Sequence, residues 1–100
     1  MSISETEIEE ITAQGVLMGA DVLSVDLADG RSISVPLAWF PRLLHGAPLE
    51  RSNWRLIGKG EGIHWPDLDE DISVAGLLAG RRSGETQESL ARWLEGRAKG

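Results

Sequence analysis

The chain has 100 residues, no cysteine and a net charge of −6. This length favours one small domain, and 41% hydrophobic with 26% charged residues is typical of a soluble globular protein. No apolar run approaches the roughly 18 residues that a membrane-spanning helix needs. The absence of cysteine excludes disulfides, thiolate catalysis and cysteine-ligated zinc.

The first ten residues, MSISETEIEE, are acidic and polar. We expect this segment (1–10) to be loosely attached or disordered, as chain termini often are. It lacks the basic and apolar stretches of a secretory signal, so a cytoplasmic location is expected.

The charge is unevenly distributed. Residues 1–50 contain eight acidic and two basic side chains, whereas residues 51–100 contain eight of each, so the net charge belongs to the first half. This balance argues against direct binding of nucleic acid and against an anionic membrane surface, because both need a basic footprint. An acidic face could instead meet a basic partner or mimic nucleic acid, or could simply keep the protein soluble.

The first half of the chain predicts strands. A short strand is expected at 11–18. Residues 22–27 and 31–37 alternate between apolar and polar and flank Asp29-Gly30, which predicts a β-hairpin with a type I′ turn. Pro36 has no N–H and should mark the end of the second strand.

Short helices and strands follow. Residues 38–46 predict a short helix, with Pro41 in its first turn and Gly46 at its end, and residues 48–54 predict another helical turn. Apolar runs at 54–58 and 62–65 predict two short strands. The glycine-rich residues between them favour a bulge or bend, because they do not have the order of a phosphate-binding loop.

The last third predicts two helices. Acidic residues at 67–71 favour a helix start, so a helix is expected from Asp67 to Gly80, with Ile72 and Leu77 on its apolar face. After a linker at 81–85, Ser83 or Thr86 should cap a final helix that runs to about 96. The predicted fold class is α+β: a small antiparallel sheet with an Asp-Gly-turn hairpin, covered by short helices and ending in a C-terminal helix.

Three blocks together suggest a family: LSVDLADGR (23–31), VPLAWFPRLL (35–44), and WRLIG (54–58) followed by GIHWPDLDEDI (62–72). In this order they resemble a small bacterial family called domain of unknown function 2442, over about residues 11–80. Residues 83–97 resemble the ending of one of its subgroups. The resemblance implies an α+β domain at 11–80, with 81–100 as a linker and helix that pack on it.

The same resemblance implies no established activity. Some members of that family are encoded beside predicted toxin-like partners, and others are fused to helix-turn-helix domains. Both contexts imply an interaction or regulatory role.

Carboxylates cluster near one histidine. Asp67, Asp69 and Asp71 have the spacing of a calcium loop, but Ile72 and Leu78 stand where an EF-hand needs glycine and glutamate, which excludes that motif. His64 with these carboxylates could hold a divalent metal or act in acid–base catalysis. Alternatively, the acids cap a helix and favour its dipole. We therefore assign no catalytic, cofactor-binding or metal-binding residue and leave enzymatic activity open.

The four tryptophans are first candidates for the core, although exposed tryptophans also mark protein interfaces. Trp39 is the best candidate for exposure, because it lies where a strand passes into a helix. Arg42 and Arg51 could pair with the acidic half. The candidate interaction surface comprises Trp39, Arg42, His64, Trp65, Asp67 and Asp69.

Three functional hypotheses remain. The first is a noncatalytic protein-interaction or regulatory module, an adaptor or antitoxin-like subunit with a protein partner. The second is an acidic inhibitor or nucleic-acid mimic that uses Glu7, Glu9 and Glu10 against a basic partner. The third is a small metal-binding protein or enzyme built on His64 and Asp67. An exposed edge strand could also support a homodimer.

Overall fold

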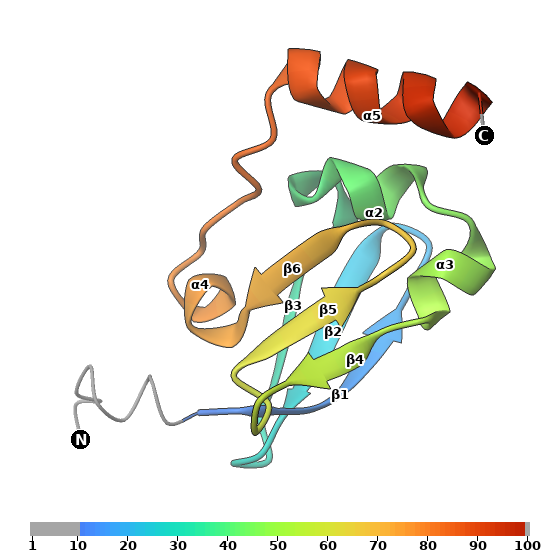
Figure 1. Cartoon of the computed structure of the whole chain (residues 1–100). Helices are drawn as coiled ribbons and strands as arrows, with labels where there is room; N and C mark the ends of the chain where they lie inside the picture. The colour runs from blue at the N-terminus through green and yellow to red at the C-terminus, as the bar shows by residue number, and fades with distance from the viewer. Residues whose placement is uncertain (1–10, 100) are drawn as a thin grey trace.

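The computed structural model describes residues 11–99, so the acidic segment 1–10 lies outside the described residues. Two three-stranded antiparallel sheets form the centre of the fold (Figure 1). Sheet A has the order β1-β2-β3 and sheet B the order β4-β5-β6. The strands are β1 (Ala13–Met18), β2 (Val22–Leu27), β3 (Ser32–Pro36), β4 (Arg55–Ile57), β5 (Gly62–Trp65) and β6 (Glu70–Ser73).

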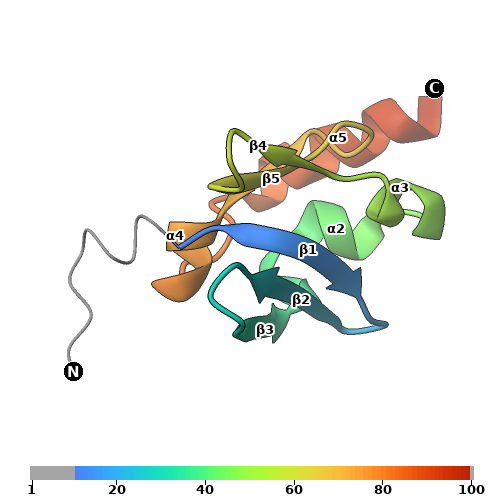
Figure 2. The same ribbon diagram turned by 90° about the horizontal axis from the view of Figure 1, so that it is seen from below.

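Short helices close the two ends of the paired sheets. α4 lies at one end and α2 and α3 lie at the other, while α5 runs beside α2 (Figures 1 and 2). The helices are η1 (Leu37–Trp39), α2 (Pro41–His45), α3 (Pro48–Ser52), α4 (Val74–Leu78) and α5 (Gln87–Lys99). The α+β prediction is therefore confirmed, with two small sheets instead of one.

The hairpin of β2 and β3 is confirmed. Leu23, Val25 and Leu27 are buried, and the alternate residues face outward. On that outer face, Ser24 and Ser34 share a hydrogen bond of 2.8 Å across the strands. Apolar residues at every second position thus place one face of sheet A on the core.

The turn of this hairpin differs from the type I′ prediction. The Leu27 N–H donates to the Arg31 carbonyl at 2.8 Å, and the Gly30 N–H donates to the Leu27 carbonyl at 3.1 Å. Gly30 has φ +94°, whereas Asp29 is not among the described residues with positive φ. The loop is therefore a three-residue turn that ends on a left-handed glycine, a geometry that also requires Gly30.

The helix predicted from Asp67 to Gly80 is wrong over its first half. Glu70–Ser73 form β6, which pairs with β5 in the register Ile63↔Ile72. Helix α4 starts only at Val74, and its N-cap is Ser73, whose Oγ accepts from the Gly76 N–H at 2.8 Å. Of the acidic residues before it, Asp67 and Asp69 belong to the turn between β5 and β6, where Asp69 adopts φ +49°, and Glu70 and Asp71 belong to β6.

Trp65 lies at the centre of the core with none of its surface exposed. Its indole N–H donates to the Arg51 carbonyl at 2.9 Å. The Arg51 guanidinium in turn donates to the carbonyls of Leu43, at 2.7 Å, and Leu44, at the end of α2. Arg51 therefore binds helix carbonyls and not the acidic half, because the last turn of a helix leaves carbonyls without partners.

We expect Trp65→Phe to lower the free energy of unfolding by about 2–3 kcal/mol, because it leaves the Arg51 carbonyl unpaired and opens space in the core. Trp54→Phe is the matched control. Trp54 is only partly buried and its indole makes no hydrogen bond among residues 11–99, so its loss should cost less than half as much. Urea unfolding followed by circular dichroism measures both, and equal costs would contradict the central role of Trp65.

Candidate interaction site

An extended segment connects α4 to α5 and packs along the domain. We call residues 81–86 the strap. The Arg81 N–H donates to the Gly76 carbonyl at 2.9 Å, and the Ser83 N–H donates to the Trp39 carbonyl at 3.0 Å. The Arg82 guanidinium lies 4.7 Å above the Trp39 ring. The cation–π contact and the backbone bonds hold the strap against η1.

Arg42 fixes the other end of the strap. Its Nε donates to Glu85 at 2.6 Å, and its Nη1 donates to the Asp69 carbonyl at 3.1 Å. The side chains of Arg42 and Glu85 are only 16% and 12% exposed, and the Arg42 hydrogen bond lowers the pKa of Glu85. The prediction that Arg42 pairs with the acidic half is wrong, because its carboxylate partners are Glu85 and, at 3.4 Å, Asp69.

Helix α5 is attached through its side chains. Thr86 caps it, accepting from the Ser89 N–H at 3.0 Å, which confirms one of the two predicted caps. Two guanidiniums lie over the Trp93 ring, with that of Arg42 5.2 Å and that of Arg97 4.7 Å from the ring centroid. Arg97 also binds Glu50 of α3, and this hydrogen bond lowers the pKa of Glu50 to about 2.

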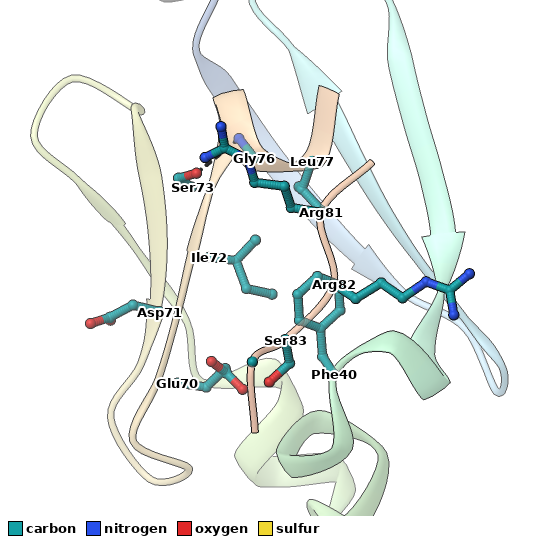
Figure 3. A pocket seen from close by; sticks show the side chains of 11 residues that line it. Phe40, Glu70, Asp71, Ile72, Ser73, Gly76, Leu77, Arg81, Arg82 and Ser83 are labelled. Atoms are coloured by element: carbon teal, nitrogen blue, oxygen red, sulfur yellow. Dashed lines mark hydrogen bonds between the residues drawn. The ribbon is translucent and has the colours of Figure 1, made fainter. Parts of the chain in front are cut away.

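A groove of about 250 Å³ lies between β6 and residues 81–84 of the strap (Figure 3). We call it the β6 groove. Phe40, Ile72 and Leu77 form its apolar floor. Arg81 lies at the end near Ser73, Glu70 lies at the opposite end, and Arg82 points away from the groove (Figure 3). The groove is therefore apolar in the middle and carries opposite charges at its two ends.

The free edge of β6 forms one wall of this groove. The Val74 N–H donates to the Glu61 carbonyl at 2.9 Å on β5. Because antiparallel residues alternate between paired and outward-facing, the N–H and C=O groups of Asp71 and Ser73 point away from β5. Within residues 11–99 the Asp71 groups and the Ser73 N–H bind no other backbone atom, whereas the Ser73 C=O is the N-cap carbonyl of α4 and accepts its first intrahelical bond. The wall is thus a short row of main-chain donors and acceptors.

Glu70 lies at the end of the groove opposite Arg81 and is half-buried. Burial raises the pKa of its carboxyl group, while the Asp71 N–H and the charge of Arg42 act in the opposite direction. The pKa values of two glutamates are thus shifted in opposite directions. Desolvation raises the pKa of Glu70, and the hydrogen bond to Arg42 lowers the pKa of Glu85.

The structure brings together only part of the predicted surface. Arg42 and Asp69 are in contact, and Trp39 and Arg42 hold different parts of the strap. Asp67 instead accepts from the Asn53 amide at 2.8 Å. Trp65 cannot belong to a surface, because it is fully buried. The sequence patterns did not predict four lining residues of the groove, Phe40, Ile72, Ser73 and Arg81. The edge that they line belongs to a strand that was predicted as part of a helix.

The His64 side chain lies on the face of sheet B that points away from Trp65 and the core. Its Nδ1 pairs with Asp71 across the strands, while Asp67 and Asp69 bind other groups. Among residues 11–99, no group of three or more histidine, cysteine or carboxylate side chains is placed to hold a metal ion. The described part of the chain also contains no helix that is both long and apolar enough to cross a bilayer. The described part of the chain therefore offers a pair of possible ligands at His64 and no larger cluster.

We expect Glu85→Gln to lower the free energy of unfolding by about 1–2 kcal/mol at pH 7, because a charge-assisted hydrogen bond to Arg42 is lost. The pKa of Glu85 is lowered by folding, so this contribution exists above its ordinary value of 4.5 and disappears as the pH falls through the lowered value. Urea unfolding at several pH values tests this. A deficit that persists unchanged at pH 2 would exclude an electrostatic cause.

Glu70→Gln should have the opposite effect. The pKa of Glu70 is raised by burial, so the ionised carboxylate costs stability above that raised value, and the cost vanishes below the ordinary value of 4.5. The variant should therefore unfold at a higher urea concentration than the native chain at pH 7 and at the same concentration at pH 3.5. A lower midpoint at pH 7 would show that Glu70 is stabilised by its partners rather than penalised by burial.

Comparisons with known proteins agree with this fold. A family described as "Protein of unknown function (DUF2442)" matches residues 13–83. The crystal structure of a protein of unknown function from Rhodospirillum rubrum is 27% identical, with a TM-score of 0.65 over 79% of this chain and 95% of that one. The solution structure of an uncharacterised protein from Chromobacterium violaceum is 24% identical, with a TM-score of 0.63 over 81% of this chain and 74% of that one, and supports the fold. No match was found among curated proteins. Because the family match spans most of its length, the chain belongs to the DUF2442 family.

Proposed function

We propose that this protein is a noncatalytic interaction module that binds an extended segment of a protein partner in the β6 groove. The observation that carries this proposal is the free edge of β6 beside an apolar floor. An extended peptide added to a sheet edge gains affinity from main-chain hydrogen bonds and specificity from alternate side chains. The outward Asp71 C=O and Ser73 N–H supply the main-chain hydrogen bonds, and the apolar floor supplies the specificity.

The lining defines the chemistry of the partner segment. Phe40, Ile72 and Leu77 suit one apolar side chain. Arg81 forms no ion pair with the described residues, and its position at the Ser73 end favours an acidic side chain there. A segment with an acidic residue next to an apolar one therefore fits best.

The strap makes the second wall of the groove. Its contacts through Trp39 and Arg42 do not involve the groove floor, so the wall is in place before a partner arrives. A preformed site loses less entropy on binding than one that must order itself. An adaptor or an antitoxin-like subunit would be a specific form of this function, with the partner protein supplying the segment.

The two alternative functions have less support. Among the described residues of the acidic first half, Asp29 and Glu50 each bind an arginine of the same chain, which reduces the acidic field that an inhibitor of a basic partner would use. The remaining acids of that hypothesis, Glu7, Glu9 and Glu10, lie outside the described residues. Within residues 11–99, the metal hypothesis is supported only by the pair of His64 and Asp71.

A phage-displayed random-peptide library, selected on the full chain, tests the proposal, with Ser73→Pro and Ser73→Ala as matched variants. Ser73 has φ −87°, close to the proline value, and its N–H points out of the sheet. Proline removes this donor and the helix cap, whereas alanine removes only the cap. We expect selected peptides, measured by calorimetry, to bind Ser73→Pro at least tenfold more weakly than Ser73→Ala.

Arg81→Glu should reverse the charge preference, so that selected acidic peptides are lost and basic ones are gained. Equal affinities for the proline and alanine variants would rule out pairing at the β6 edge. Failure to enrich any peptide on the full chain would also count against the proposal.

A further inference from the structure

The outer edge of sheet A carries no charge. Residues 13–19 read AQGVLMG, whereas natural edge strands are usually protected by charged residues, proline or bulges. One irregularity lies between Ala13 and Gly15, and the Ala13 N–H donates to the Gly60 carbonyl at 2.8 Å. This protection covers only the start of β1. The rest of the strand is open, and Leu17 is 71% exposed.

The register of β1 shows which main-chain groups face outward. The Gly19 N–H donates to the Val22 carbonyl at 2.8 Å, and Leu17 pairs with Ser24 in the same ladder. Because antiparallel residues alternate, the N–H and C=O groups of Val16 and Met18 point away from β2. Neither residue makes a backbone hydrogen bond outside sheet A within residues 11–99.

We propose that two copies of this chain associate through antiparallel pairing of β1 with β1, about a two-fold axis at Leu17. In this register Val16 of each copy exchanges two hydrogen bonds with Met18 of the other. Leu17 then lies opposite Leu17 in a non-hydrogen-bonded pair, where the Cα atoms are about 4.5 Å apart. The two copies of sheet A join into one continuous sheet.

Three features favour a second copy over a different partner. The outward groups of Val16 and Met18 are placed evenly about Leu17, as an isologous contact requires. Strand β1 itself holds no charged side chain, and Arg51, which lines the adjoining groove, is engaged by the carbonyls of α2, so two chains of net charge −6 place no β1 carboxylates at the seam. The exposed leucine also finds an apolar match in its own copy.

Space for the second strand exists beside β1. A groove of about 340 Å³ lies there, lined by β1 on one side and by Pro48, Arg51, Ser52 and Trp54 on the other. Trp54 and Pro48 give the incoming strand an apolar support. This groove and the β6 groove share no lining residue, so self-association leaves the proposed peptide site open.

Disulfide trapping tests the register directly, because the native chain has no cysteine. Leu17→Cys places two thiols across a non-hydrogen-bonded pair, at a Cα separation within the range of a disulfide. Under a mild glutathione redox buffer, we expect this variant to become mostly a linked dimer. Leu49→Cys is the control, since Leu49 is 84% exposed but lies away from the seam, and it should remain mostly unlinked. Similar linking of both variants would overturn the proposal.

Sedimentation of the full chain gives an independent measurement. The native chain should sediment as a dimer, and Leu17→Lys as a folded monomer, because it sets two like charges opposite each other. Ile57→Lys changes an exposed residue of β4 and should leave the dimer intact. A native chain that remains monomeric at millimolar concentration would refute the pairing. Leu17→Lys should still bind the selected peptides, which separates this test from that of the β6 groove.

Discussion

The hydrogen bond from the Trp65 indole to the Arg51 carbonyl joins the parts of the molecule that are too small to be stable alone. Trp65 belongs to sheet B, Arg51 to α3, and the Arg51 guanidinium holds the final carbonyls of α2. A helix of five residues has too few internal bonds to persist in water. The position of α2 is therefore set by Arg51 and the core. Arg42, which anchors the strap, is carried on that helix, so the second wall of the β6 groove depends on the same contact.

The sequence was sufficient where the structural signal is local. Alternation over 22–37 predicted the β2–β3 hairpin, because burial of every second side chain is a property of the strand itself. Prediction from the sequence failed at 67–73, where acidic residues before Ile72 are compatible with either a helix start or a turn. The decision there is made by pairing with β5 and by burial of Ile72 against the core, and neither is visible in a short window of sequence. The exact type of the Asp29-Gly30 turn was missed for a related reason, since one glycine satisfies both geometries.

The site was harder to predict than the fold. The sequence nominated Trp39, Arg42 and Asp69 as interacting residues, but their contacts are with the strap, and Arg42 is 43 positions from Glu85. Contacts between residues so far apart along the chain produce no periodic pattern in the sequence. Trp65 was placed on the surface because tryptophan is common in both cores and interfaces, and only its position on the inner face of β5 decides between them. The groove was absent from the prediction because an edge cannot be proposed for a strand that has not been recognised.

The charge that is unbalanced along the sequence becomes partly balanced in space. Glu50 of the acidic half binds Arg97 of the last helix, so the described domain does not keep a simple acidic end. Its surfaces differ in how the free edges of the strands are protected. The edge of β6 is faced by the strap, which leaves a groove beside it and not an open edge, and this arrangement suits the proposed peptide segment. β1 carries no charge and has outward groups that repeat evenly about Leu17, which is the basis of the proposed pairing with a second copy. Two sheets with differently protected edges can therefore support binding of a partner and self-association without competition between them.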